Sequence, residues 1–180
     1  MRRILISLAA AALAAGLLAV PAAASATVSP AAVSARAVPA CTSSELGVWL
    51  AISKGDVAAG SVFYPLEFTN LSGHACSLDG YPGVSAMSRA DTQQGSPATR
   101  YLGTNPRAVV LAAGATAHAK FVWSDTAVYT APGCDPTSDV ATLRVYPPGQ
   151  RSATSAMFSL EACSRPGAWF MSVGPIVPGD

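Results

Sequence analysis

Residues 66–84 read LEFTNLSGHACSLDGYPGV, and this stretch decides the fold class. Apolar and polar residues alternate through residues 62–69, which is the period of a strand with one buried face. Residues 70–73 are typical of a turn. We expect a second strand to begin near Cys76 and to end at the Gly/Pro turn of residues 80–83. The face of the first strand expected to point inward carries Val62, Tyr64, Leu66 and Phe68.

The rest of the chain repeats this pattern in short segments. Apolar or alternating runs recur at residues 46–51, 84–87, 108–111, 117–123, 143–146, 156–160 and 171–173. Gly, Pro and polar residues separate these runs. Short strands spaced in this way predict an all-β fold, an antiparallel two-sheet sandwich of immunoglobulin-like architecture with about seven or eight strands. Pro65 has no backbone N–H, so we expect its strand to lie at a sheet edge or to be bulged there.

The N-terminus has the pattern of a secretion signal. Two arginines precede an apolar run at residues 4–20, and Ala24-Ser25-Ala26 presents small residues where a signal peptidase cleaves. We predict a signal peptide at residues 1–26, with cleavage after Ala24 as the second choice. A retained membrane anchor is the alternative, which is disfavoured because alanine contributes little to membrane insertion.

Three segments follow the predicted cleavage site. Residues 27–40 are rich in Ala, Pro, Ser and Val, and we expect a disordered spacer there. Residues 41–177 are expected to form a single β-sandwich domain, and residues 178–180 a tail. This length of chain is typical of one domain.

The charge balance argues against nucleic acid and anionic membrane surfaces as partners. Without residues 1–26, Lys plus Arg falls from 11 to 9 against 10 acidic residues, so the formal net charge changes from +1 to −1. Because the remaining charges are scattered, they offer no electrostatic footprint for nucleic acid or an anionic membrane surface, and we expect no nucleic-acid partner. We also expect no stable membrane insertion after signal cleavage. The signal peptide predicts a secreted protein, either released or associated with the cell envelope, and we expect a monomer.

Four cysteines remain after cleavage, and an even count in an exported chain predicts two disulfides. Four cysteines allow three connectivities. We favour Cys41–Cys76 and Cys134–Cys163, which connect each half of the domain locally. Closing loops of this size contributes about 3–4 kcal/mol each in the chain-entropy model.

No catalytic, cofactor or metal site is predicted. The chain has two histidines and lacks the G-x-S-x-G, H-E-x-x-H and S-x-x-K motifs. His74 and Cys76 form a His-x-Cys pair that could hold copper if Cys76 were reduced. We expect instead that Cys76 is disulfide-bonded, that His74 is a turn residue, and that His118 points outward beside Lys120.

Exposed aromatic side chains are the best sequence indication of a binding surface. Trp49 lies opposite the apolar face of its strand, and one residue of the pair Trp169-Phe170 must point outward. Tyr81, in the Gly/Pro turn, is a third candidate, whereas Trp123 shares the phase of the core. We expect a non-enzymatic interaction module whose partner is a protein or a cell-wall glycan. The alternative is an exported enzyme or enzyme inhibitor with a loop-built site around Asp91, Arg100 and Asp135.

Several of these segments together resemble a known family. They are Cys41, LEFTN at 66–70, CSL at 76–78, GYPGV at 80–84, residues 110–117, Cys134, LRVYPPG at 143–149 and Cys163. In combination they are similar to the small secreted actinobacterial proteins of domain-of-unknown-function family 4232, over nearly the whole predicted mature chain. The resemblance implies an exported β-sandwich and carries no catalytic residues.

Overall fold

The structure is a computed structural model that describes residues 37–179, except 104, 126–132, 138 and 160. The predicted signal peptide and most of the predicted spacer lie outside the described residues. Strands make up nearly all of the regular structure, with two short 3-10 helices, η1 (Ser43–Glu45) and η2 (Ile52–Lys54). Among the described residues, no helix is long and apolar enough to cross a membrane.

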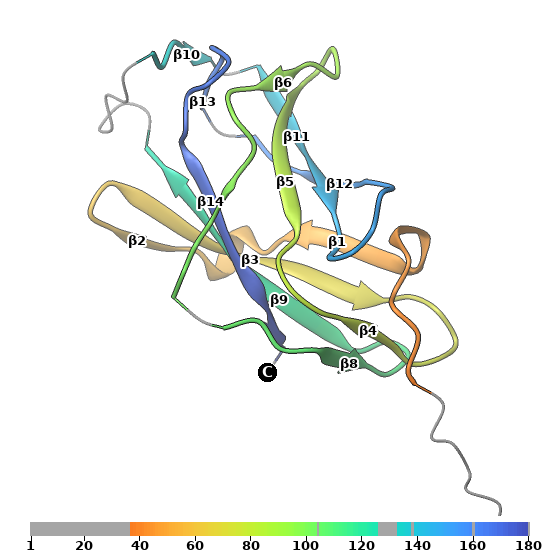
Figure 1. The fold of residues 1–180 in the computed structure, drawn as a ribbon. Helices are drawn as coiled ribbons and strands as arrows, with labels where there is room; N and C mark the ends of the chain where they lie inside the picture. Colours follow the sequence, from red (N-terminus) through yellow and green to blue (C-terminus); the bar gives the residue numbers. More distant parts are fainter. Residues whose placement is uncertain (1–36, 104, 126–132, 138, 160, 180) are drawn as a thin grey trace, which may run out of the picture. The chain divides into compact units, whose positions relative to one another are not determined.

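The larger sheet has six strands in the order β1-β3-β9-β14-β7, with β2 also paired to β3 (Figure 1). β14 runs parallel to β7, and the other pairs in this sheet are antiparallel. The strand bounds are β1 (Leu46–Leu50), β2 (Asp56–Ala58), β3 (Ser61–Asn70), β7 (Thr99–Arg100), β9 (Thr116–Ser124) and β14 (Met171–Pro178).

The second sheet has four strands in the order β12-β11-β5-β6, and two further pairs are β4-β8 and β10-β13. Their bounds are β4 (Cys76–Leu78), β5 (Gly83–Ser88), β6 (Gln93–Gln94), β8 (Val109–Leu111), β10 (Pro136–Thr137), β11 (Val140–Tyr146), β12 (Thr154–Met157) and β13 (Ala162–Cys163). The described residues therefore contain fourteen strands, more than the expected seven or eight, because several have only two or three residues.

The two sheets pack against each other through aromatic side chains. Phe121 and Trp123 of β9 contact Phe158, which follows β12, at ring-centre distances of 6.0 and 4.7 Å. Trp123 also lies 4.7 Å from Phe170. All four rings are at most 3% exposed. Burial of apolar side chains from both sheets is the main stabilising term of such a sandwich. The all-β prediction is confirmed, and the immunoglobulin-like comparison stays a prediction.

Pro65 contradicts the expectation that it marks an edge or a bulge. It lies within β3, which pairs on both sides, and its register with Lys120 of β9 is unbroken. The Ala51 N–H donates to the Pro65 carbonyl at 2.9 Å. Since the N and O of a strand residue point to the same side, the proline nitrogen faces the gap between β1 and β2. An interior strand accepts proline here because the neighbouring strand is interrupted.

The N-terminal end of the fold starts before Cys41. The Ser77 N–H donates to the Pro39 carbonyl, and the Cys41 N–H donates to the Ser77 carbonyl. Cys41 is disulfide-bonded to Cys76, and Cys134 to Cys163, which are the pairs favoured from the sequence. At the other end, β14 continues to Pro178, one residue past the predicted domain end.

Asn70 connects β3 to the β4–β8 pair. Its side chain is fully buried, and its amide nitrogen lies 2.8, 3.1 and 3.2 Å from the carbonyl oxygens of His74, Leu111 and Ala112. Its amide oxygen accepts hydrogen bonds from the backbone N–H and the hydroxyl of Ser72. The turn in residues 70–73 is therefore held by one polar side chain whose hydrogen bonds are all internal.

Candidate functional site

The outer face of the larger sheet carries a row of side chains from four strands. Trp49 of β1 pairs in register with Glu67 of β3, Glu67 with His118 of β9, and His118 with Val177 of β14. Cross-strand neighbours of this kind have Cβ atoms about 4.5–5.5 Å apart. The row points away from the core because the alternate residues, such as Leu66, Ala117 and Ala119, are fully buried.

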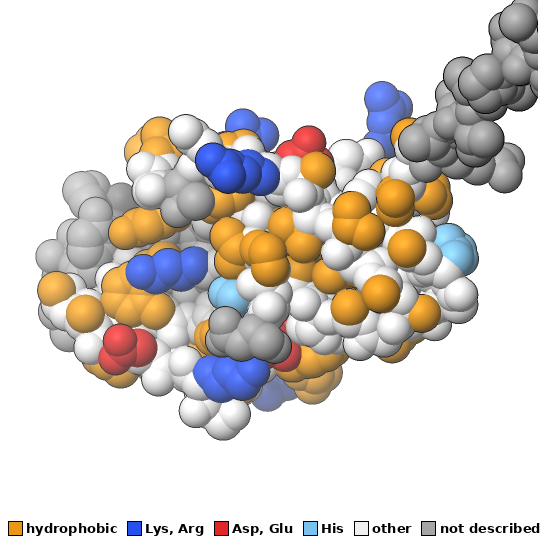
Figure 2. Space-filling model, turned by 90° about the horizontal axis from the view of Figure 1, so that it is seen from below, with side chains coloured by type: hydrophobic (Ala, Val, Ile, Leu, Met, Phe, Trp, Pro, Cys, Tyr) orange, Lys and Arg blue, Asp and Glu red, His pale blue; other side chains and the backbone are white. Residues whose placement is uncertain are grey.

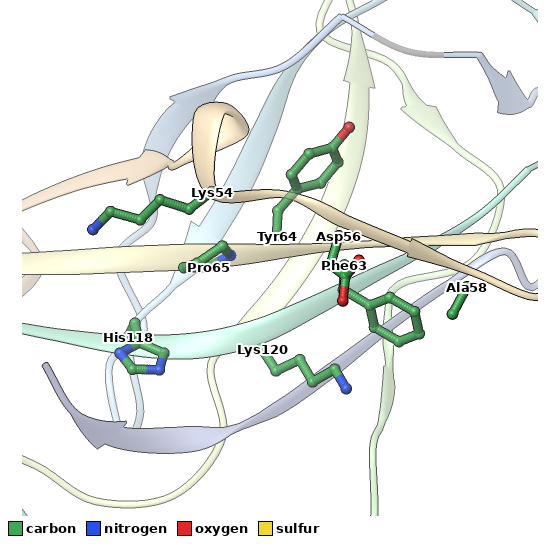
Figure 3. Close-up of a pocket in the computed structure, with 8 residues that line it drawn as sticks. All are labelled: Lys54, Asp56, Ala58, Phe63, Tyr64, Pro65, His118 and Lys120. Atoms are coloured by element: carbon green, nitrogen blue, oxygen red, sulfur yellow. The ribbon is translucent and has the colours of Figure 1, made fainter. Parts of the chain in front are cut away.

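Two adjoining hollows open on this face. The larger, of about 450 Å³, is lined by Lys54, Asp56, Ala58, Phe63, Tyr64, Pro65, His118 and Lys120 (Figure 3). The smaller, of about 310 Å³, is lined by Lys54, Pro65, Glu67, Thr116, His118 and Gly179. Three residues line both, so the two hollows form one groove across β3 and β9, which we call the outer groove. Tyr64 points away from Lys120 and His118 in Figure 3.

The charges in the outer groove are partly neutralised. The Lys54 ammonium lies 2.7 Å from Oε1 of Glu67, whose side chain is only 12% exposed. Asp56 accepts a hydrogen bond from the Val57 N–H at 2.8 Å. Lys54 and Lys120 are the only two lysines of the chain, and both line the larger hollow.

Lys120 is held by aromatic rings. Its ammonium nitrogen lies 4.2 Å from the ring centre of Phe63 and 5.1 Å from that of Tyr101. The Tyr101 N–H donates to the Val173 carbonyl, which fixes this residue beside β14. Gly174 of β14 lies beside the lysine, since a Cβ there would make an ordinary van der Waals contact of 3.5 Å with Cβ of Lys120. Cation–π contacts therefore orient the ammonium group.

Charge does not gather into one patch on the face of the described residues that Figure 2 shows. Figure 2 shows a face on which hydrophobic side chains lie among separate basic, acidic and histidine side chains. This mixed arrangement suits a ligand with apolar surface and spaced charges better than a nucleic acid, whose phosphates form a continuous line of negative charge.

The three aromatic candidates from the sequence lie in different surroundings. Trp49 is 41% exposed, on the outer face beside Glu67. Trp169 is 68% exposed and lines a separate hollow of about 250 Å³ with Thr99 and Ser124, whereas Phe170 is buried, as expected for such a pair. Tyr81 is half-buried, and Cζ of Arg100 lies 5.1 Å from its ring centre. No hollow brings these three rings together in the described part of the chain.

The residues of the alternative, loop-built site are also separated. Asp91 pairs with Arg144 at 2.7 Å, Asp135 pairs with Arg165 at 2.9 Å, and Arg100 lies over Tyr81. Three partners in three places do not make a convergent catalytic cluster.

The His74-x-Cys76 pair has other partners as well. Cys76 is in a disulfide, and Nε2 of His74 lies 3.2 Å from Oε1 of Glu45. Hydrogen bonds from the Thr42 backbone N–H and then the Thr42 hydroxyl hold the pKa of Glu45 below its ordinary value. Within the described ranges, no group of three or more His, Cys, Asp or Glu side chains could hold a metal ion.

Sequence reasoning did not find the outer groove. Strand alternation places His118 and Lys120 on one face of their strand, and this is what the structure has. However, Lys54, Phe63 and Tyr101 come from other segments, and only the strand registers bring them to Lys120. The chain has only two lysines, and this scarcity could have drawn attention to Lys120 from the sequence.

Comparison with known proteins agrees with the resemblance described above. Searches of curated proteins and of solved structures found no match. A family model described as a domain of unknown function, DUF4232, matches residues 41–175. Since the match covers most of the chain, this protein belongs to the DUF4232 family.

Proposed function

We propose that this protein is an exported, non-enzymatic binding module whose ligand lies on the outer face of the larger sheet. The observation that carries the proposal is the row from Trp49 to Val177 beside the outer groove. Trp49, Lys54 and Lys120 are exposed there, next to the partly buried ring of Phe63. Aromatic rings beside a few polar groups are typical of sites that bind sugars or small ligands.

Export is supported by the two disulfides and by the predicted signal peptide. Disulfides persist in oxidising compartments, which agrees with a protein that acts outside the cytoplasm. The family resemblance implies an actinobacterial source, where the protein is either released or associated with the cell envelope. We propose a monomer that binds a cell-wall glycan.

A binding role is favoured over catalysis by the way the charged groups are arranged. Glu67 is neutralised by Lys54, and Asp91 and Asp135 each pair with an arginine. General acid–base or nucleophilic catalysis needs a reactive group beside a positioned base, and the outer groove presents no such pair.

Co-sedimentation with isolated cell-wall polysaccharide tests the proposal. Trp49→Ala and Trp169→Ala make a matched pair, because each removes one exposed indole, from the outer face and from a separate hollow respectively. We expect saturable binding that Trp49→Ala weakens and Trp169→Ala retains. Equal binding by all three proteins, or binding lost only in Trp169→Ala, would contradict the assignment to the outer face.

A further inference from the structure

We propose that the outer groove binds a carboxylate group of an acidic polysaccharide, with Lys120 and His118 as the residues that contact the anion. This inference rests on the proposed function and specifies the chemistry of its ligand. Neither residue was among the aromatic residues that the sequence indicated for a binding surface.

The charge of Lys120 is oriented by aromatic rings and is not neutralised by any acidic side chain in the described part of the chain. Its ammonium nitrogen contacts the rings of Phe63 and Tyr101, and no acidic side chain among the described residues forms an ion pair with it. The nearest acid in the row, Glu67, is already paired with Lys54 at 2.7 Å. A ligand carboxylate would therefore supply an ion-pair partner that the described residues do not provide for Lys120.

His118 adds a second contact for the anion. It lies two residues before Lys120 on the same outer face of β9, and it lines both hollows. The charged groups around it are Glu67 of β3, Lys54 of η2, Lys120 of β9 and Asp56 of β2, of which Glu67 and Lys54 neutralise each other. The imidazole can donate a hydrogen bond to a carboxylate in either protonation state.

The apolar part of the groove suits a sugar ring. Phe63 and Pro65 line the larger hollow next to Lys120, and they offer C–H and ring surface beside the ammonium group. The two hollows, about 450 and 310 Å³, adjoin along the sheet. This shape accommodates consecutive units of an extended chain, with one carboxylate at Lys120.

Two other classes of macromolecule fit less well. Eight residues line the larger hollow, whereas a standard protein interface uses about 20–30 residues on each side. A nucleic acid would need several cations along its phosphates, and Asp56 and Glu67 lie in the same groove. A polymer with spaced carboxylates on sugar rings matches the groove better than either.

Calorimetric titration with a short oligogalacturonate tests this inference, with its fully methyl-esterified form as the neutral counterpart. The protein is expressed from the full sequence and purified as the host processes it, with both disulfides formed. Lys120→Gln removes the charge, Lys120→Arg retains it, and Arg151→Gln removes an exposed charge in the loop between β11 and β12. An oligoglutamate of equal charge represents an acidic peptide.

We expect oligogalacturonate to bind more tightly than its ester, and the affinity to fall as salt is added. Because Lys120 is exposed, Lys120→Gln should weaken binding about two- to fivefold, as for other exposed ion pairs. Lys120→Arg and Arg151→Gln should bind like the wild type.

Any of four outcomes overturns the inference. They are absence of any saccharide binding, equal binding of acid and ester, an affinity unchanged by Lys120→Gln, and tighter binding of oligoglutamate than of oligogalacturonate. Co-sedimentation judges the proposed function separately. If wild type binds wall polysaccharide and Trp49→Ala does not, a binding module is supported even if its ligand is uncharged.

Discussion

The ammonium nitrogen of Lys120 lies 4.2 Å from the ring centre of Phe63, although 57 positions separate the two residues in the chain. The contact joins neighbouring strands β3 and β9, and Tyr101 approaches the same nitrogen from beside β14. A lysine held in this way keeps its charge available to a ligand while its side chain is already ordered. This pre-organisation lowers the entropy cost of binding.

A double-mutant cycle measures that contact. Phe63→Leu and Lys120→Met each remove one partner, and we expect a coupling free energy of about 0.5–1 kcal/mol, which is typical of exposed cation–π pairs. The measurement is urea unfolding of the wild type, both single variants and the double variant. The matched control combines Phe63→Leu with Lys54→Met, whose lysine pairs with Glu67, and should show no coupling. Equal coupling in both cycles would refute the contact.

Asn70 should be the most sensitive polar position in the fold. Asn70→Asp keeps the shape but replaces the amide nitrogen by an oxygen facing the carbonyls of His74, Leu111 and Ala112. Leaving these groups unpaired should cost about 2–4 kcal/mol of unfolding free energy. Ser72→Ala removes one hydroxyl from the same turn and should cost much less. Chemical denaturation ranks the two, and a similar cost for both would contradict the central role of Asn70.

Glu45 should contribute to stability in a pH-dependent way. Its pKa is lowered by the hydrogen bond from the Thr42 N–H and then by that from the Thr42 hydroxyl. A lowered pKa in the folded state stabilises the fold above the unfolded-state value, near 4.5, and this contribution is lost as the pH falls below it. Wild type should therefore be more stable than Glu45→Gln at neutral pH.

The measurement for Glu45 is the unfolding free energy of both proteins as a function of pH. The difference in unfolding free energy between wild type and Glu45→Gln should shrink as the pH falls through the range below 4.5. Thr42→Val keeps the backbone N–H that bonds to Glu45, so in that variant Glu45 should still contribute part of this pH-dependent stability. A difference that stays constant over the titration would contradict the assignment.

The two disulfides should stabilise the fold to a similar extent. Their sequence separations are 35 and 29 residues, and in the chain-entropy model each loop closure contributes about 3–4 kcal/mol. Replacing either pair by alanine should lower the unfolding free energy by about this amount. Intact mass with thiol alkylation should find no reactive cysteine in the native protein. Alkylation of native cysteines would contradict the pairing.

Much of the secondary structure could be read from the sequence, because side-chain alternation reports which face of a strand is buried. Residues 62–69 and 117–123 show this: Leu66, Phe68, Phe121 and Trp123 are all at most 3% exposed. The outward position of Trp49 followed from the same alternation, whereas for Trp169 and Phe170 alternation said only that one of the two points outward. The two disulfides are also the pairs favoured from the sequence, each of which closes a loop within one half of the domain.

The outer groove could not be read from the sequence, because it depends on strand register between distant segments. Alternation places Glu67 and His118 on outward faces, but nothing in either segment says that they face each other. Pro65 was misjudged for a related reason: its acceptance in an interior strand depends on where β1 ends and β2 begins. The sequence around Pro65 contains no information about that gap.

The most direct test of a ligand site over the outer groove uses the two lysines. Reductive ¹³C-methylation keeps their charge and labels Lys54, Lys120 and the N-terminal amine for NMR. The resonance missing in Lys120→Arg identifies Lys120, and we predict that the rings of Phe63 and Tyr101 shift it upfield. Soluble fragments of wall polysaccharide should move this resonance in a saturable manner. The account would be contradicted if the Lys120 resonance showed no ring-current shift and did not move on addition of a polysaccharide that binds the protein in co-sedimentation.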